Sequence, residues 1–322
     1  MTTGVPQGSV LGPVLFILYI ADVIELIKSH GLTPHGYADD HQAYAGCPPG
    51  EVDQLSARVS TCLDDVTDWM RANRLQLNTS KTEVIWFGTP RQAAQLPNTP
   101  LRIKDIGVTP TGTVRDLGVW LDSDLAMRSQ ISKTVAGSFA ALRQLRSLSQ
   151  SVSRLTLSSL CSSLVLSRLD FANSVLMGLP ACEIARLQVV QNAAARLVYH
   201  AQSRDHVTPL LSELHWLRVE DRVKFKVATL TFKCLHGLAP PYLARDIVPV
   251  ASLPGRQALR SASSSSVAQP PFRLITFGAR TFASSAAHLW NSLPEALRSC
   301  PTLLSFRGQL KTHLFRAAYR PD

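Results

Sequence analysis

The chain has 322 residues, of which 45% are hydrophobic and 17% are charged. This composition is typical of folded globular protein in two or three compact units, and it excludes a wholly disordered chain. The net charge of +10 is unevenly distributed, because residues 1–122 hold nine Lys and Arg against 13 Asp and Glu, whereas residues 123–322 hold 24 against ten. The second part is therefore the candidate for binding a polyanion such as nucleic acid, and a solvated basic surface is the alternative.

Two further features narrow the class of protein. None of the six cysteines lies in a CxxC pair, which argues against a zinc knuckle and against the disulfide framework of a secreted domain. Reduced thiols suit an intracellular protein, either nuclear or cytoplasmic. The apolar run at residues 14–21 is followed by Asp22 and is much shorter than the roughly 20 residues of a membrane span, so we expect a core helix and no membrane partner.

In chain order, the first 122 residues alternate between helical and extended patterns. A turn-rich segment at residues 4–9 precedes a helix, and apolar residues at three- and four-residue steps predict a second, amphipathic helix. Alternating patterns bounded by Gly and Pro predict strands, including a hairpin with its tip at Asp39-Asp40. The expected helices are 13–28 and 51–74, and the expected extended segments are 35–46, 84–87, 101–103 and 114–121.

Beyond residue 123, long helical patterns dominate and prolines separate them. The stretch 253–273 is rich in Ser, Ala and Pro, so it is expected to be a linker. The expected helices are 125–150, 154–177, 181–201 and 217–236.

The paired carboxylates of Asp39 and Asp40 are the first candidate for chemistry. Two adjacent carboxylates on a tight turn stay ionised together most easily when a cation lies near them. Mg²⁺ prefers a few carboxylates together with substrate phosphates, and two such ions about 4 Å apart stabilise the attacking and leaving oxygens in nucleotidyl transfer. An isolated Asp-Asp pair is common, so a solvated turn is the alternative.

Neighbouring sequence motifs give the Asp-Asp pair a more specific interpretation. It belongs to a YxDD box, Tyr37-Ala38-Asp39-Asp40, preceded by the decapeptide 4–13 and followed by Trp69-Met70, residues 77–83 and Leu117-Gly118-Val119. This series, in this order and spacing, resembles the reverse transcriptases of LINE-type (non-LTR) retrotransposons. The segments 232–243 and 289–294 are also similar to the C-terminal tails of such elements, of the CR1, L2 or jockey kind. The resemblance is strong to about residue 122 and looser beyond it.

The resemblance implies an α+β fold. Residues 1–122 would form a partial polymerase palm, an antiparallel sheet with helices that carries motifs B to E and the primer-grip hairpin. Residues 123–252 would form a helical, thumb-like and basic region. A Ser/Pro-rich linker at 253–273 and a small C-terminal segment at 274–322 would follow.

The decapeptide corresponds to polymerase motif B. Gly4 and Gly8 would let the backbone approach the templating base and the incoming nucleotide, because they lack a Cβ. Gln7 would lie along the template strand, and Pro6 would shape the turn together with Gly8. Ser9 completes this expected nucleotide-binding loop, for which an ordinary loop before a helix is the alternative.

The YxDD box would hold the metal. Asp39 would be a direct ligand of Mg²⁺, or of Mn²⁺ in its place, and Asp40 would support the site. Tyr37 would lie near the nucleotide or the primer end, with packing on a strand as the alternative. Lys81 matches the motif D lysine, which could donate a proton to the departing pyrophosphate or neutralise it, and an ordinary surface lysine is its alternative.

The remaining expected contacts are with nucleic acid. Leu117 and Gly118 match the primer grip, in which the backbone holds the primer end, and a plain buried strand is the alternative. The cluster Arg222, Lys224 and Lys226 is a candidate RNA contact, for which a solvated helix face is the alternative. The cations expected to follow the phosphates of a template–primer duplex are Arg128, Lys133, Arg143 and Arg146.

The implied function is RNA-directed DNA synthesis by two-metal nucleotidyl transfer, with an RNA template, a DNA primer and deoxynucleoside triphosphates as partners and with protein partners left open. The family's first catalytic aspartate lies in motif A, upstream of motif B, and the sequence contains no counterpart before residue 4. We therefore expect this chain alone not to polymerise DNA, and we expect its palm to expose apolar surface. Three alternatives remain open: a fragment completed by another polypeptide, an inactive remnant that binds RNA or an RNA–DNA hybrid, and a decayed product without selected function.

Overall fold

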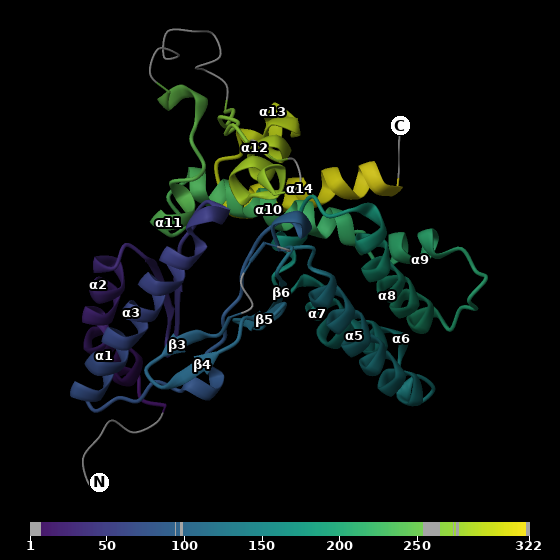
Figure 1. Ribbon diagram of the computed structural model, residues 1–322. Coiled ribbons are helices and arrows are strands. Elements are labelled where there is room, and N and C mark those ends of the chain that lie inside the picture. The colour runs from purple at the N-terminus through teal and green to yellow at the C-terminus, as the bar shows by residue number, and fades with distance from the viewer. Residues whose placement is uncertain are drawn as a thin grey trace. The chain divides into compact units, whose positions relative to one another are not determined.

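The computed structural model describes residues 8–93, 95–96, 99–253, 265–272, 274 and 277–319, which fall into two compact units (Figure 1). The first unit ends at Leu125 and the second starts at Ala126. The first combines helices with three two-stranded antiparallel sheets, and the second is built from helices. The mixture of helices and small antiparallel sheets agrees with the predicted α+β class.

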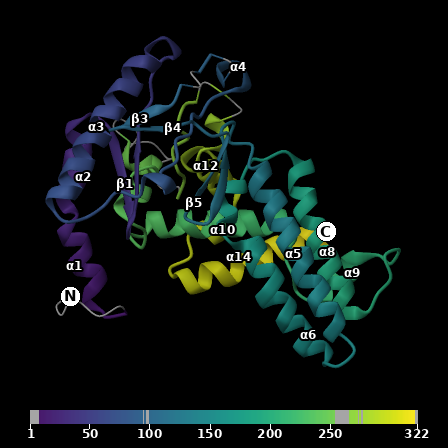
Figure 2. The same cartoon turned by 60° about the horizontal axis from the view of Figure 1, so that its bottom comes forward.

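The helices of the first unit bury one face. Helices α2 and α3 lie side by side (Figure 2), because their apolar residues recur at helical spacing. Their cluster includes Val23, Ile27, Leu55, Cys62 and Val66, and Trp69 packs against it. The helices are α1 (Leu11–Tyr19), α2 (Ala21–Ser29), α3 (Val52–Ala72) and α4 (Pro90–Ala93), with 3₁₀ turns at Pro49–Glu51 and Thr79–Lys81.

Helix α1 differs from α2 and α3 because none of its side chains is buried. The prediction of a single helix over residues 13–28 is wrong. The helix is interrupted at Ile20, where φ −95° and ψ 3° leave the helical region. A helix that is apolar on all sides is normally covered by protein. The exposed apolar side chains are Leu11, Val14, Leu15, Ile17, Leu18 and Tyr19.

The strands form three hairpins. The predicted hairpin at 35–46 and the strand at 101–103 are confirmed, and the segment 114–121 is two strands joined by a tight turn. The strand predicted at 84–87 is wrong, because this segment meets its neighbours through separate backbone hydrogen bonds and not through a ladder. The pairs are β1 (Thr33–Tyr37) with β2 (Asp40–Tyr44), β3 (Leu101–Ile103) with β4 (Ile106–Val108), and β5 (Thr113–Asp116) with β6 (Val119–Asp122).

The second unit contains the long helices predicted from periodicity. The predictions at 125–150, 181–201 and 217–236 are confirmed as helices, with ends shifted by a few residues. The predicted helix 154–177 is interrupted by a π-helical stretch, Ser162–Leu166, and ends where Ala172 adopts a left-handed conformation. The α-helices are α5 (Arg128–Leu148), α6 (Arg154–Cys161), α7 (Ser167–Asp170), α8 (Ala181–Tyr199), α9 (Val207–Glu213), α10 (Val219–Leu235), α11 (Pro241–Ala244), α12 (Phe282–Ser292), α13 (Glu295–Arg298) and α14 (Leu303–Tyr319).

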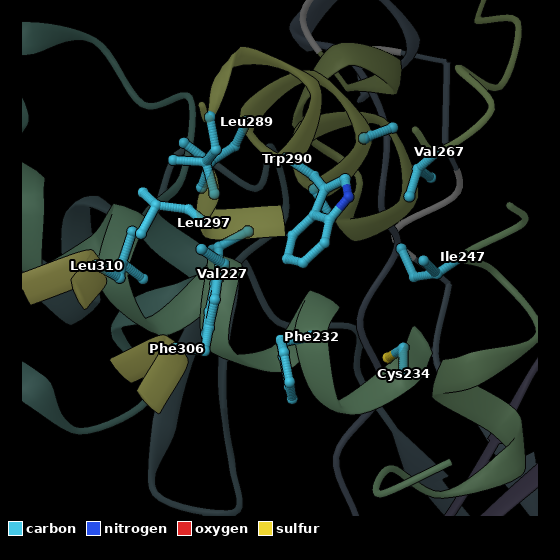
Figure 3. Packing of buried hydrophobic residues seen from close by; sticks show 14 of the residues in the cluster. Val227, Phe232, Cys234, Ile247, Val267, Leu289, Trp290, Leu297, Phe306 and Leu310 are labelled. Atoms are coloured by element: carbon cyan, nitrogen blue, oxygen red, sulfur yellow. The ribbon is translucent and has the colours of Figure 1, made fainter. Parts of the chain in front are cut away.

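An aromatic cluster forms the core between α10, α12 and α14 (Figure 3). The rings of Phe232 and Phe306 stack with centroids 4.7 Å apart, and the Trp290 ring lies 5.6 Å from that of Phe306. All three side chains are at most 1% exposed. Aromatic side chains bury a large apolar area per residue, so this cluster contributes strongly to the stability of the unit.

Residues 265–268, within the predicted linker, are held firmly against α12. The Asn291 side chain accepts a hydrogen bond from the Val267 N–H (2.9 Å) and donates one to the Val267 carbonyl (2.8 Å). Val267 is 2% exposed and pairs with Pro249 in an isolated β-bridge. Residues 254–264 of the predicted linker, and Arg273, lie outside the described residues, and the predicted domain limits remain predictions.

Among the residues that the structure describes, no helix combines the length and the apolar character needed to cross a bilayer. All six cysteines are free thiols.

Candidate active site

The YxDD box forms the tip of the β1–β2 hairpin. Tyr37 pairs with Asp40, so Ala38 and Asp39 are the two turn residues and Asp40 opens β2. The tip therefore lies one residue earlier than predicted. Ala38 has φ +54°, and the two-residue turns that match the twist of hairpin strands need a positive φ at their first residue.

Both carboxylates at this tip are open to solvent. Asp39 and Asp40 are exposed, and neither carboxylate forms an ion pair or accepts a hydrogen bond from any residue that the structure describes. The Tyr37 side chain is 67% exposed, so it does not pack into the core. The same part of the chain holds no group of three or more His, Cys, Asp or Glu suited to a metal ion. The tip thus offers two carboxylates and leaves the remaining ligands of any bound cation to be supplied by something else.

A side-chain hydrogen bond joins this hairpin to the β5–β6 hairpin. The Gln42 amide donates to Oδ1 of Asp116. Alternate residues of a strand share a face, so Asp40 lies on the same face of β2 as Gln42. The face that carries Asp40 is therefore the face bonded to β5.

The turn of the β5–β6 hairpin is formed by the predicted primer-grip residues. Leu117 has φ +43° and Gly118 has φ +87°, and two consecutive positive φ values are typical of a type I′ turn. Asp116 pairs with Val119 directly beside this turn. The Gln42 contact thus brings the YxDD hairpin next to the Leu117-Gly118 turn.

Lys81 lies on the 3₁₀ turn Thr79–Lys81. Asn78 shapes this turn by accepting hydrogen bonds from the Ser80 hydroxyl at its side chain (2.7 Å) and from the Thr82 hydroxyl at its carbonyl (3.1 Å). The Lys81 side chain is exposed and forms no ion pair with the described acidic residues. Its charge is therefore available to an anionic ligand.

The segment after Lys81 runs along the base of the β5–β6 hairpin. The Val84 carbonyl accepts a hydrogen bond from the Thr111 N–H (2.8 Å), and the Gly88 N–H donates to the Ser123 carbonyl (3.0 Å). The segment 84–88 and the β1–β2 hairpin, which are far from β5 and β6 in sequence, therefore both contact the β5–β6 hairpin.

The loop that we predict to be motif B is only partly described. Gly4, Pro6 and Gln7 lie outside the described residues, so their predicted closeness to Asp39 is not tested. Gly8 has φ +87°, which is a conformation that favours glycine. Ser9 accepts a hydrogen bond from the Gly12 N–H (3.0 Å), so its hydroxyl caps the start of α1.

The predicted phosphate-contacting cations all lie on α5. Arg128, Lys133, Arg143 and Arg146 are exposed, whereas Ile131, Leu142 and Leu145 bury the opposite side of the helix. Arg143 and Arg146 form no ion pair with the described acidic residues. These two cations are therefore available to an anionic partner.

The cluster at 222–226 is less open to RNA than its composition indicates. Arg222 binds both carboxylate oxygens of Asp170, and Lys224 pairs with Glu220 at 2.7 Å. Lys226 is the exposed member that has no acidic partner among the described residues.

Three residues next to the predicted site were not predicted. Gln42 and Asp116 join the two hairpins, and His41 contacts the Asp39 carbonyl. The period of two in β2 could have placed Gln42 with Asp40, but no local pattern identifies Asp116 as its partner.

Comparisons with known proteins show what the chain is similar to. A family described as "Reverse transcriptase (RNA-dependent DNA polymerase)" matches residues 1–121. The chain is 27% identical over 243 residues to "Probable RNA-directed DNA polymerase from transposon X-element" of Drosophila melanogaster, covering 69% of this chain and 24% of that protein. It is 25% identical over 289 residues to "Probable RNA-directed DNA polymerase from transposon BS" of the same species, covering 84% of this chain and 30% of that protein.

No solved structure matches. The chain spans less than a third of the length of these two relatives. The family match covers the YxDD hairpin and the turn bonded to it, and both relatives are polymerases of transposons. Residues 1–121 thus match the reverse transcriptase family, and the chain is similar to probable RNA-directed DNA polymerases of transposons, consistent with a reverse transcriptase fragment of a LINE-type, non-LTR retrotransposon.

Proposed function

We propose that the first unit carries part of the polymerase site for RNA-directed DNA synthesis, with an RNA template, a DNA primer and deoxynucleoside triphosphates as substrates. The observation that supports this most directly is the Gln42–Asp116 hydrogen bond. It unites the hairpin that presents two exposed carboxylates with the hairpin whose Leu117-Gly118 turn would hold the primer end.

The residues present fit a divalent metal shared with a nucleotide. Mg²⁺ is commonly bound by one or two carboxylates together with substrate phosphates, and Asp39 and Asp40 are two exposed carboxylates without a cation partner among the described residues. Asp39 would be the direct ligand and Asp40 the supporting one, with Mn²⁺ as a substitute for Mg²⁺. When bound, the metal would neutralise charge on the attacking and leaving oxygens. Lys81 would neutralise the departing pyrophosphate or donate a proton to it.

The two units would correspond to two parts of a polymerase. The first unit would be a partial palm, and the α5 helix of the second unit would belong to a thumb-like region. Arg128, Lys133, Arg143 and Arg146 on α5 would contact the phosphates of the template–primer duplex.

The exposed helix α1 supports the view that a further polymerase segment packs on the first unit. Its apolar side chains are uncovered, and the relatives are more than three times as long as the matched part of this chain. We propose that this further segment supplies the other metal-binding carboxylate, so the chain alone does not extend a primer.

The test of the metal site is Mn²⁺ titration followed by NMR. The paramagnetic ion broadens signals near its binding site, so the amide signals of Asp39 and Asp40 should disappear first. Asp39→Asn should abolish this broadening, whereas Asp105→Asn, which removes an exposed turn carboxylate elsewhere in the unit, should not. Broadening that begins elsewhere, or that survives Asp39→Asn, would reject the site.

Primer extension on an RNA template tests the inactivity of the chain alone. We expect no Mg²⁺-dependent product. Extension that Asp39→Asn abolishes would show that the chain is active without a further segment, and it would contradict this part of the proposal.

A second candidate function is binding of RNA or an RNA–DNA hybrid without catalysis. It is supported by the exposed cations Arg143, Arg146 and Lys226, which have no acidic partner among the described residues. Removing one cation that binds a phosphate should lower the salt slope of binding by about one. We therefore expect Arg143→Ala with Arg146→Ala to lower the slope by about two, and Lys28→Ala, whose cation is paired with Glu25, to leave it unchanged. An unchanged slope in the double variant would remove α5 from the binding surface.

A further inference from the structure

Few side-chain contacts among the described residues hold the tip of the β1–β2 hairpin. Ala38 occupies a positive-φ position that normally takes glycine, and this costs of order 1 kcal/mol for a residue with a Cβ. Neither carboxylate of the tip has a partner among the described residues. The contact that reaches into the turn comes from His41, whose Nδ1 lies 3.0 Å from the Asp39 carbonyl oxygen.

The geometry determines the proton position on this ring. A carbonyl oxygen is only an acceptor, so Nδ1 must carry the proton and donate it to Asp39. In the neutral ring, Nε2 is then an acceptor. His41 Nε2 is buried and has no hydrogen-bond partner in the part of the chain that the structure describes.

The His41 ring and a side chain of α2 lie over the same glycine. His41 is directly opposite Gly36 in the hairpin. A Cβ placed on Gly36 would lie 3.8 Å from His41 Cδ2 and 3.8 Å from Ile24 Cδ1, so the ring and the Ile24 side chain both cover this glycine. The imidazole therefore links the turn to the helix beneath it.

A buried nitrogen without a partner is unfavourable by about 1–3 kcal/mol. Local stability alone would favour an apolar side chain at this position, because Gly36 and Ile24 provide an apolar surface. A histidine here is better explained by what its other nitrogen does.

We propose that His41 is the positioning residue of the YxDD carboxylates. Its Nδ1–H holds the Asp39 carbonyl and so fixes the peptide plane between Asp39 and Asp40, from which both carboxylates project. The ring lies over Gly36, which the Ile24 side chain of α2 also covers, so the ring has little room to move. The inference rests on the proposed function of these carboxylates as metal ligands, and groups that orient metal ligands in this way commonly change metal affinity by about 10- to 100-fold.

His41 is not itself a metal ligand. Successive residues of a strand point to opposite faces, so His41 lies on the face away from Asp40, toward α2. Its Nε2 is buried and its Nδ1 is engaged with Asp39. It acts only through the backbone of the tip.

Two substitutions separate positioning from packing. His41→Leu keeps an apolar side chain of similar size over Gly36 but has no donor. His41→Asn keeps a donor near the position of Nδ1 but loses most of the packing. If His41 acts through packing, the leucine variant should bind Mn²⁺ at the tip more tightly than the asparagine variant. If His41 positions the carboxylates, the asparagine variant should bind Mn²⁺ more tightly.

The experiment measures Mn²⁺ binding by broadening of the Asp39 and Asp40 amide signals in the full chain, with thermal unfolding of each variant as the folding control. We expect His41→Leu to remain folded and to bind Mn²⁺ at the tip about tenfold more weakly, and His41→Asn to bind within about twofold of the original chain. Equal Mn²⁺ affinity in the original chain and the leucine variant would overturn the proposal.

A second measurement needs no variant and no metal. The ¹⁵N signals of the neutral His41 ring should show a protonated Nδ1 and a bare Nε2, and the opposite tautomer would overturn the hydrogen bond to Asp39. Absence of Mn²⁺ broadening at the tip of the original chain would instead reject the metal site of the proposed function. The two failures are therefore distinguishable.

Discussion

The tip of the β1–β2 hairpin and the segment 265–268 are both short stretches outside the helices, but they differ in how their polar groups are paired. At the tip, the carboxylates of Asp39 and Asp40 have no partner among the described residues. In the segment 265–268, side chains from a helix satisfy the backbone: Asn291 binds Val267, and the Trp290 indole donates to the Ser265 carbonyl (2.7 Å).

This difference separates residues that stabilise the fold from residues that are free to bind a ligand. Hydrogen-bonded and buried groups contribute to stability because exposing or unpairing them is unfavourable. Unpaired, exposed charges contribute little to folding, so their presence at the tip agrees with a role in binding. Substitutions at the two places should therefore affect different measurements.

The largest effect on folding is expected at Trp290. Trp290→Ala removes a side chain that is 1% exposed and packed on Phe232 and Phe306, which should lower the free energy of unfolding by about 3–5 kcal/mol. Hydrogen exchange should accelerate in peptides from α10, α12 and α14. A decrease below about 1 kcal/mol would show that this cluster does not hold the unit together.

Asn291→Ala should have the next largest effect. It leaves the Val267 N–H and carbonyl without their side-chain partners, and each unpaired buried group costs about 1–3 kcal/mol. Denaturant unfolding should show a decrease on the order of 3 kcal/mol. Ser292→Ala, at a neighbouring exposed position whose hydroxyl only binds its own helix, is the control and should change stability much less.

Asp221 should show a smaller effect that depends on pH. Burial raises the pKa of this carboxyl above its usual value, while Lys224 partly opposes the shift. The folded state therefore binds the proton more tightly than the unfolded chain, and stability should fall as pH rises from about 4 through the raised folded pKa. Asp221→Asn should raise the free energy of unfolding at neutral pH by less than the decrease expected at Asn291, and the gain should shrink in acid. If Asp221→Asn raises the free energy of unfolding equally at all pH values, the stabilisation comes from packing and not from the raised pKa.

The smallest effect on folding is expected at the tip itself. Asp39→Asn combined with Asp40→Asn should change the free energy of unfolding by no more than about 0.5 kcal/mol, while Mn²⁺ binding at the tip is abolished. Circular dichroism during denaturant unfolding measures the first quantity. A destabilisation of about 2 kcal/mol would mean that the acids are structural, and the contrast between the two regions would fail.

Local patterns in the sequence were sufficient for elements whose residues interact with near neighbours. The apolar spacing of α3, α5, α8 and α10 and the alternation around the YxDD box predicted these helices and the first hairpin, because helical and strand periodicity are properties of consecutive residues. Breaks within helices were missed: Ile20 and Ala172 leave the helical region at positions where no Gly or Pro marks an end.

Contacts between distant segments could not be predicted in the same way. The composition of residues 253–273 indicated a linker, yet Val267 is buried because Asn291, 24 positions later, binds its backbone. Likewise, the cations at Arg222 and Lys224 looked available until the structure placed Asp170 and Glu220 beside them. Pairing of this kind depends on which helices pack together.

By itself, the sequence determined the family-like order of the boxes, the acidic pair at a turn and the excess of basic residues after position 122, since each is a matter of residue type and spacing along the chain. Only the tertiary structure decided that Gln42 joins the acidic hairpin to the Leu117-Gly118 turn, and that His41 faces α2 and holds the Asp39 carbonyl. These contacts connect side chains to groups whose positions depend on the folded backbone, and one-dimensional spacing carries no information about which groups will meet.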